Sequence, residues 1–159
     1  MKFEAQIKEL PEHNVAYVRH VGPYNQIGQA FEKVFGWAGP KGLVQFPTTQ
    51  TLAVYHGDKE KVDASELQSD ACLTVPEGTE ADGDVKTMKI PGGTFAVAHV
   101  EIDGSEFGEA WDKLVGEWMP ENGLEPDEGR LCYELYLNDH ESHPEKKFIV
   151  DICEPVKRG

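Results

Sequence analysis

The hydrophobic and polar positions of the chain run through the same order twice. In each half, a stretch of alternating apolar residues is followed by apolar residues at helical spacing, and then by two short apolar runs. Alternation is typical of a β-strand, and spacings of three and four residues are typical of an amphipathic helix. The pattern therefore predicts a β-α-β-β module that is used twice.

The first predicted module covers residues 1–78. Its helix carries an apolar stripe at Ile27, Ala30, Phe31, Val34 and Phe35. Its strands are predicted at 15–19 within the stretch 3–21, at 51–55 and at 71–75. The stripe occupies one side of the helix, so we expect this side to face the strands.

The second predicted module covers residues 85–159, after a polar linker at 79–84. Its helix carries the corresponding stripe at Phe107, Ala110, Trp111, Leu114, Val115 and Trp118. Its strands are predicted within residues 88–100, at 131–138 and at 148–153. Antiparallel strands with helices on one face predict an α+β fold.

Individual residues match between the two halves. An offset of 80 residues, and of 81 after one inserted residue, keeps the halves in step. The matched pairs include Pro11 with Pro91, Phe31 with Trp111, Tyr55 with Tyr136 and Cys72 with Cys153. Two similar modules related by approximate twofold symmetry would leave a central groove where they meet, and ligand pockets often lie in such grooves.

The composition excludes several classes of protein. A net charge of −14 opposes binding to a phosphate backbone, so we expect no direct contact with nucleic acid. No apolar run approaches the roughly 20 residues that span a bilayer, and the N-terminus lacks a signal-peptide core, so we expect a cytoplasmic protein without a membrane partner. Three cysteines without CxxC spacing predict neither a disulfide framework nor a metal site, and we expect no cofactor.

Glu134 lies within the predicted strand 131–138. Alternation puts Leu131, Tyr133, Leu135 and Leu137 on one face, and Cys132, Glu134 and Tyr136 on the other. A glutamate on a strand can point to solvent, or it can form the floor of an aromatic pocket, where burial would raise its pKa until a cation binds. The first module has Ala53 at the position matched to Glu134, and this asymmetry favours the pocket.

Four motifs together resemble those of the GyrI-like effector-binding family. They are Val21-Gly22-Pro23-Tyr24, Ile90-Pro91-Gly92-Gly93-Thr94-Phe95-Ala96-Val97, Cys132-Tyr133-Glu134-Leu135-Tyr136-Leu137-Asn138 and Asp151-Ile152-Cys153-Glu154-Pro155-Val156. The family includes DNA gyrase inhibitor proteins and the ligand-sensing domains of multidrug-responsive transcription regulators. Each motif alone is weak, but their order and spacing are specific. The resemblance spans essentially the whole chain, as one domain at 1–159.

The resemblance implies two pseudo-symmetric β-α-β-β (SHS2-type) modules around a central ligand groove. In the regulators a strand-borne glutamate of this groove receives lipophilic cations, and Glu134 matches it. The candidate rings of the pocket are Tyr17, Tyr24, Trp37, Trp111 and Tyr136, although core packing explains the helix-face rings equally well. The sequence begins directly at the effector domain, so we expect a stand-alone protein without a helix-turn-helix segment.

Three functions are compatible with these residues. The first is the binding of a hydrophobic, cationic small molecule with Glu134 as the charged anchor. The second is inhibition of DNA gyrase through protein–protein contact. The third is hydrolysis of small electrophilic compounds, in which Glu134 and a tyrosine would activate water. No other nucleophile and base stand in a recognisable motif, so binding is favoured over catalysis. The histidines of residues 140–145 are expected in a polar turn and not on a metal.

Overall fold

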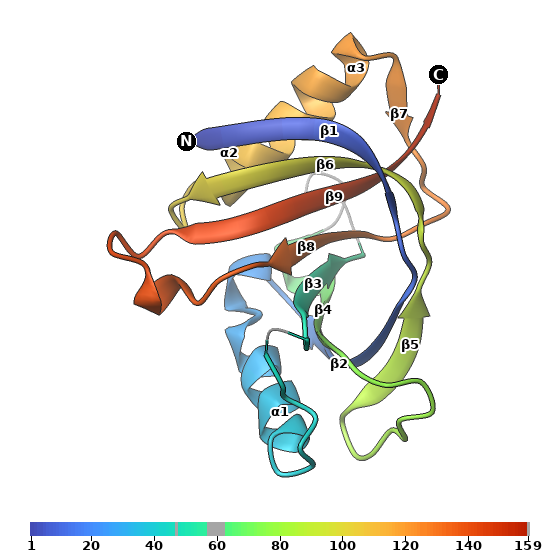
Figure 1. The fold of residues 1–159 in the computed structure, drawn as a ribbon, viewed down its shortest axis with the longest axis vertical. Helices are drawn as coiled ribbons and strands as arrows, with labels where there is room; N and C mark the ends of the chain where they lie inside the picture. Colours follow the sequence, from blue (N-terminus) through green and yellow to red (C-terminus); the bar gives the residue numbers. More distant parts are fainter. Residues whose placement is uncertain (47, 57–62, 159) are drawn as a thin grey trace. The chain divides into compact units, whose positions relative to one another are not determined.

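The computed structural model describes residues 1–46, 48–56 and 63–158. It divides the chain into two compact units, one formed by residues 12–90 and the other by residues 1–11 and 91–159. Both units combine an antiparallel sheet with a helix, which confirms the predicted α+β class (Figure 1). In the described part of the chain, no helix is both long enough and apolar enough to cross a membrane.

The described residues of the 12–90 unit form four strands and one α-helix. The strands are β2 (His13–Val21), β3 (Thr51–Tyr55), β4 (Gln68–Thr74) and β5 (Lys86–Ile90), and the helix is α1 (Gly28–Ala38). They pair in the order β5-β2-β4-β3, all antiparallel. Short 3₁₀ turns at Tyr24–Gln26 and Ala64–Glu66 interrupt the connections. The unit therefore places α1 between its first two strands in chain order, as predicted.

The second unit repeats this order with a longer helical segment. Its strands are β1 (Lys2–Leu10), β6 (Gly93–Ile102), β7 (Leu124–Pro126), β8 (Cys132–Tyr136) and β9 (Phe148–Arg158). They pair in the order β1-β6-β9-β8, and β7 pairs with the far end of β9. The helical segment is α2 (Phe107–Trp111), a π-helical stretch at Asp112–Trp118 and α3 (Met119–Glu121).

Each helix covers one face of its own sheet. In the 12–90 unit, Ala30 and Val34 of α1 pack on Ala16 of β2 and Ala71 of β4. In the other unit, the buried residues of the helical segment pack on β6 and β9. They are Ala110, Leu114 and Met119, against Ala98, Val100, Val150 and Ile152. Burial of a side chain as large as Val34, Leu114 or Met119 contributes about 1.5–3 kcal/mol, so these faces hold helix to sheet.

The strand registers of the two units correspond. In the 12–90 unit Tyr17 lies opposite Cys72, and Ala53 lies opposite Ala71. In the other unit Val97 lies opposite Cys153, and Glu134 lies opposite Ile152. These positions differ by the offsets of 80 and 81 that the sequence shows. Ala53 and Glu134 therefore occupy equivalent places in the two sheets.

The compact units differ in their limits from the predicted modules 1–78 and 85–159. The strand predicted at 15–19 lies within β2, which pairs with β4 and β5. The preceding part of the stretch 3–21 forms a separate strand, β1, which pairs with β6. The chain passes from one unit to the other at Pro11 and again at Pro91. Proline has no amide hydrogen for the ladder, so both long stretches change partner at these residues.

Candidate ligand-binding site

Glu134 lies at the centre of β8, and its carboxylate is held by two aromatic side chains. The Nε1 of Trp111 donates a hydrogen bond to Oε2 at 2.7 Å. The hydroxyl of Tyr136 donates to Oε1 at 2.6 Å. Glu134 is only 2% exposed, which excludes the solvent-facing alternative for this residue. Hydrogen bonds to a charged acceptor are short and about twice as strong as neutral ones, so they offset part of the cost of burying the acid.

The strand register places Glu134 on the helix-covered face of its sheet. It lies opposite Ile152, and Tyr136 lies opposite Val150, and both partners belong to the cluster beneath the helical segment. Trp111 ends α2, where the helix widens into its π-helical stretch, and it also packs on this cluster. The indole thus meets the carboxylate from the helix, and the phenol meets it from the same strand.

The opposite face of β8 is less regular than the predicted core stripe. Tyr133 is buried, with its ring 5.6 Å from that of Phe95. Leu137 is 44% exposed, because β8 ends at Tyr136. Asn138 closes the strand end by donating from Nδ2 to Lys147 O and accepting from Ile149 N. Only part of the leucine stripe is therefore core.

Three rings that are not among the predicted rings of the pocket extend the aromatic group around Glu134. Phe107 meets Tyr136 edge-on at 6.5 Å and Phe148 at 5.2 Å. His140 stacks on Phe148 at 4.1 Å, within the predicted polar turn. Phe107 is on the predicted helix stripe, and Phe148 opens the last predicted strand. The sequence alone could not predict the contact between these two rings. Aromatic pairs of this kind add about 0.5–1.5 kcal/mol beyond their buried area.

The remaining predicted rings belong to the 12–90 unit. Tyr24 packs against Tyr55 at 4.5 Å, and the Arg19 guanidinium lies 5.8 Å from the Tyr17 ring. Trp37 packs on the core cluster of its unit, with the Lys41 ammonium 5.3 Å from its ring. The structure thus brings Trp111, Glu134 and Tyr136 together. For Tyr17, Tyr24 and Trp37, participation in ligand binding stays a prediction.

The two units carry different chemistry at the matched positions. Where one unit has Trp111 and Glu134, the 12–90 unit has Phe31 and Ala53, neither of which has a polar side-chain atom. The carboxylate and its indole donor are therefore present together in one unit and absent together from the other. Both units have a tyrosine at a third matched position, Tyr55 in the 12–90 unit and Tyr136 in the other.

Arg130 fixes the chain just before β8. Its guanidinium donates to the carbonyl oxygens of Gly92, Thr94 and Val156, and to the carboxylate of Asp127 at 3.0 Å. Gly93 has a positive φ of 135°, and a Cβ there would collide with the guanidinium. The Pro-Gly-Gly motif of the sequence thus makes room for the arginine that anchors the β8 strand.

Two further titratable groups share the face of Glu134. Burial, together with the nearby Glu154, raises the pKa of the Cys132 thiol to about 12, which disfavours a thiolate nucleophile. Burial raises the pKa of Glu154 to about 7, although a hydrogen bond from Cys132 opposes that shift. Glu154 therefore changes its charge near neutral pH.

A second polar cluster lies in the 12–90 unit and was not predicted. The guanidinium of Arg19 donates to both carboxylate oxygens of the fully buried Asp70, and His56 Nε2 also contacts that carboxylate. At the matched cross-strand position of the other unit, His99 Nδ1 lies 2.7 Å from Asp151. Pairing across adjacent strands in both units is typical of a structural role.

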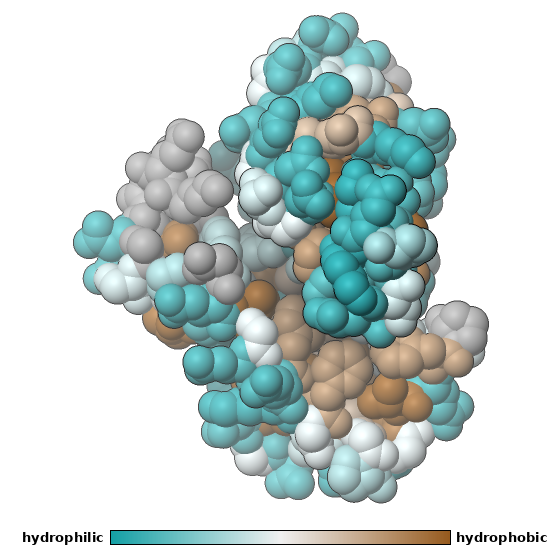
Figure 2. All heavy atoms as spheres, turned by 90° about the vertical axis from the view of Figure 1, so that its left-hand side faces the viewer, coloured by the Kyte–Doolittle hydropathy of each residue, from teal (hydrophilic) through white to brown (hydrophobic). Residues whose placement is uncertain are grey.

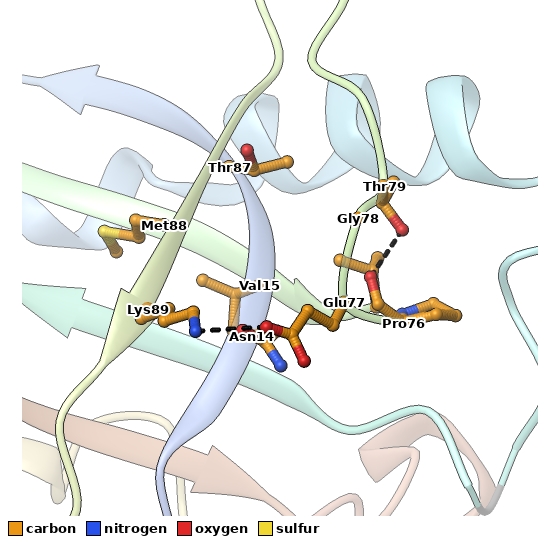
Figure 3. A pocket seen from close by; sticks show the side chains of 10 residues that line it. Asn14, Val15, Pro76, Glu77, Gly78, Thr79, Thr87, Met88 and Lys89 are labelled. Atoms are coloured by element: carbon orange, nitrogen blue, oxygen red, sulfur yellow. Dashed lines mark hydrogen bonds and ion pairs between the residues drawn. The ribbon is translucent and has the colours of Figure 1, made fainter.

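A shallow pocket of about 250 Å³ lies elsewhere in the 12–90 unit (Figure 3). It is formed by β2, β5 and the turn after β4, and Lys89 reaches across it to Glu77 at 3.3 Å. An ion pair already spans this pocket, and it has none of the predicted site residues. Among residues 1–46, 48–56 and 63–158, no group of histidine, cysteine, aspartate and glutamate is arranged to hold a metal ion.

Comparison with known proteins identifies the family of the chain. The GyrI-like small molecule binding domain matches residues 3–157. DNA gyrase inhibitor 2 of Dickeya dadantii (strain 3937) is 36% identical over 136 residues, which are 83% of each chain. Relatives named DNA gyrase inhibitor occur in further bacteria, including Pectobacterium carotovorum subsp. carotovorum (strain PC1), at 35% identity over 161 residues covering 99% of this chain and 98% of the relative.

Solved structures share the fold at low sequence identity. The C-terminal domain of EcmrR is 18% identical, with a TM-score of 0.79 and full coverage of both chains. In the EcmrR–DNA complex the TM-score is 0.82 at 17% identity, over 99% of this chain and 58% of that one. SAV2435 bound to tetraphenylphosphonium gives a TM-score of 0.60 at 12% identity, over 97% and 94%. The sequence motifs, the fold and the match over residues 3–157 agree, and the chain belongs to the family of GyrI-like small molecule binding domains.

Proposed function

We propose that the chain binds hydrophobic, cationic small molecules, with Glu134 as the charged anchor. One observation carries the proposal, namely a buried carboxylate whose two oxygens accept hydrogen bonds from Trp111 and Tyr136. The chain belongs to a family of small-molecule binding domains, so the buried Glu134 carboxylate is a natural candidate for contact with the ligand. The absence of such a group at Phe31 and Ala53 supports a role beyond folding.

The chemistry of the site favours a flat or bulky organic cation. A positive charge near Glu134 gains coulombic attraction in a region poor in water. Each contact between the cation and a ring face adds about 1 kcal/mol, or about 2 when desolvated. The apolar surface of the guest adds roughly 25 cal/mol for each Å² that it buries. These terms place few demands on the shape of the guest, so we expect micromolar affinity for several cations.

Calorimetric titration with tetraphenylphosphonium tests the proposal. The neutral triphenylphosphine oxide serves as a guest of similar shape without the charge. Glu134→Gln keeps the size of the side chain and removes its charge, and we expect it to weaken cation binding about tenfold or more. Glu109→Gln, at an exposed position of α2, is the matched control and should bind as the native protein does. Equal cation affinity in native protein and Glu134→Gln contradicts the proposal.

Inhibition of DNA gyrase is the second candidate function. It is favoured by relatives of this chain that carry that name at 35–36% identity. Figure 2 shows hydrophilic side chains over the upper part of one face and an apolar area below them. The net charge of −14 suits contact with a basic protein surface. A supercoiling assay with purified gyrase and excess protein tests it directly. Unchanged supercoiling at a large molar excess would remove this candidate.

We also infer that the two units derive from one duplicated SHS2-type β-α-β-β module. The shared strand order, the matched registers and the residue offsets of 80 and 81 support this history. In such a history one copy has gained, or the other has lost, the carboxylate and its indole donor. Ligand chemistry would then be concentrated in the unit that carries Glu134.

A further inference from the structure

Glu154 lies on the same face of the sheet as Glu134. In the antiparallel β8–β9 pair, Glu134 is opposite Ile152, and Glu154 follows Ile152 by two residues along β9. Side chains two residues apart on a strand point to the same side. Diagonal neighbours in such a pair have Cβ atoms about 7 Å apart, so the two side chains leave the sheet about 7 Å apart on its helix-covered face.

The surroundings of Glu154 leave its charge uncompensated. Its carboxylate accepts a hydrogen bond from the Cys132 thiol, and the negative charge of Glu128 contributes to raising its pKa. Its partner on β6 is Ala96, and the helical segment contributes the apolar Leu114 and Met119 to the cluster that flanks it on β9. Within residues 1–46, 48–56 and 63–158, no lysine, arginine or histidine forms an ion pair with Glu154.

Glu154 is half-buried and not sealed inside the core, and Cys132 beside it is half-buried as well. A half-buried carboxylate without a cation is costly, because water no longer solvates it fully. The raised pKa of about 7 is the expected response to this environment. A bound positive charge would relieve the same cost and keep the carboxylate ionised.

We propose that Glu154 is a specificity-determining residue that gives the Glu134 site a preference for dications whose two charges are about 7 Å apart. This inference rests on the proposed function and extends it to a class of ligand. One positive group would lie at Glu134 among the rings of Trp111 and Tyr136, and the second would lie at Glu154. A monocation would use Glu134 alone.

Two quaternary ammonium compounds test the proposal. Para-xylylene bis(trimethylammonium) carries two charges across one benzene ring, and benzyltrimethylammonium is its monocationic counterpart. At about pH 8, where Glu154 is ionised, we expect the native protein to bind the dication about tenfold more tightly. Glu154→Gln should bring the two affinities close together and leave monocation binding unchanged. At about pH 6 protonation of Glu154 should reduce the preference in the native protein but not in the variant.

A control separates local from general electrostatics. The acidic protein attracts any dication through its net charge. The control Glu125→Gln, at an exposed position of β7 that does not share the face of Glu154, also removes one negative charge from the same unit. It should retain the native preference. Circular dichroism melting checks that Glu154→Gln is folded, and Glu154→Asp, which keeps the charge, should retain part of the preference if the glutamine variant is unstable.

The outcomes distinguish this inference from the proposed function. If Glu134→Gln binds both compounds as the native protein does, the proposed function fails. If binding depends on Glu134 but the ratio of the two affinities is the same in native protein and Glu154→Gln, only the dication proposal fails. A native preference that does not change between about pH 6 and about pH 8 also overturns it.

Discussion

The indole nitrogen of Trp111 donates a hydrogen bond to Oε2 of Glu134 across 2.7 Å, from the last residue of α2 to the centre of β8. The contact joins helix and sheet through a polar pair at a place where the matched unit has only Phe31 and Ala53. The 12–90 unit also packs its helix on its sheet, with phenylalanine and alanine at these two positions. The proposed binding function rests on this pair.

Replacing Trp111 with phenylalanine should recreate the apolar position of the other unit beside an acid that lacks one of its donors. Loss of a hydrogen bond to a buried charged group costs about 1–3 kcal/mol, so we expect the free energy of unfolding to fall by that amount. Urea denaturation measures it. Trp118→Phe is the matched control, since its indole makes no hydrogen bond to the described residues. A smaller loss for Trp111→Phe than for the control would show that the bond is weak in solution.

If the protein is a hydrolase, Tyr136 would take part in proton transfer, whereas in the binding function it donates a hydrogen bond to Glu134. Its hydroxyl donates to Glu134 Oε1 at 2.6 Å, the arrangement that could share a proton during activation of water. If the chain hydrolyses small activated esters or epoxides, Tyr136→Phe should lower turnover at least about 100-fold, while cation affinity changes only a few-fold. Absence of turnover in the native protein excludes hydrolysis of those substrates and leaves binding intact.

Periodicity predicted most elements of both units but not their partners. The helix stripe places Ala30, Val34, Ala110 and Leu114 in the core, and all four are buried there. It could not show that β1 pairs with β6 instead of extending β2, because alternation along a strand is the same for any neighbour. The π-helical stretch after Trp111 also escapes a pattern that assumes 3.6 residues in each turn.

The candidate site was foreseen only in part, for a related reason. Glu134 and Tyr136 share a strand, so their proximity follows from alternation alone. Trp111 was a candidate ring, but its bond to Glu134 joins residues 23 apart and depends on how the helix lies on the sheet. The Arg19–Asp70 pair, 51 residues apart, could be recognised only from the strand register.

Gly93 should tolerate no side chain. Its φ of 135° is strained for other residues, and a Cβ would displace the Arg130 guanidinium from the carbonyl groups that it holds. We expect Gly93→Ala to lower the free energy of unfolding by about 1–3 kcal/mol, measured by chemical denaturation. Gly116→Ala, in the π-helical stretch where a Cβ meets nothing within 4 Å, is the control and should be neutral or slightly stabilising. Equal effects at the two positions would refute the role of Arg130.

The two cross-strand side-chain pairs, Arg19 with Asp70 and His99 with Asp151, should differ in strength. The Asp70 side chain is 0% exposed and contacts both Arg19 and His56, whereas the Asp151 side chain is 18% exposed and pairs with a His99 side chain that is 51% exposed. Asp70→Asn should cost about 2–3 kcal/mol, a value reduced because Arg19 reaches solvent. Asp151→Asn should cost less than about 1 kcal/mol. Thermal melts of both variants at one pH decide, and similar losses would contradict the burial argument.

Glu154 should make stability depend on pH in the direction opposite to most acidic residues. Its pKa is raised to about 7 in the folded chain, above the ordinary value of 4.5. The folded state therefore binds more protons than the unfolded state between these values, and this contribution to stability is complete below about pH 4.5 and lost as the pH rises through about 7. Glu154→Gln lacks this titration. We expect the variant to gain about 2 kcal/mol relative to the native protein between about pH 5 and about pH 8, as measured by urea denaturation across that range. A constant difference between the two proteins would place the Glu154 carboxyl in water and remove the basis for its proposed part in ligand selection.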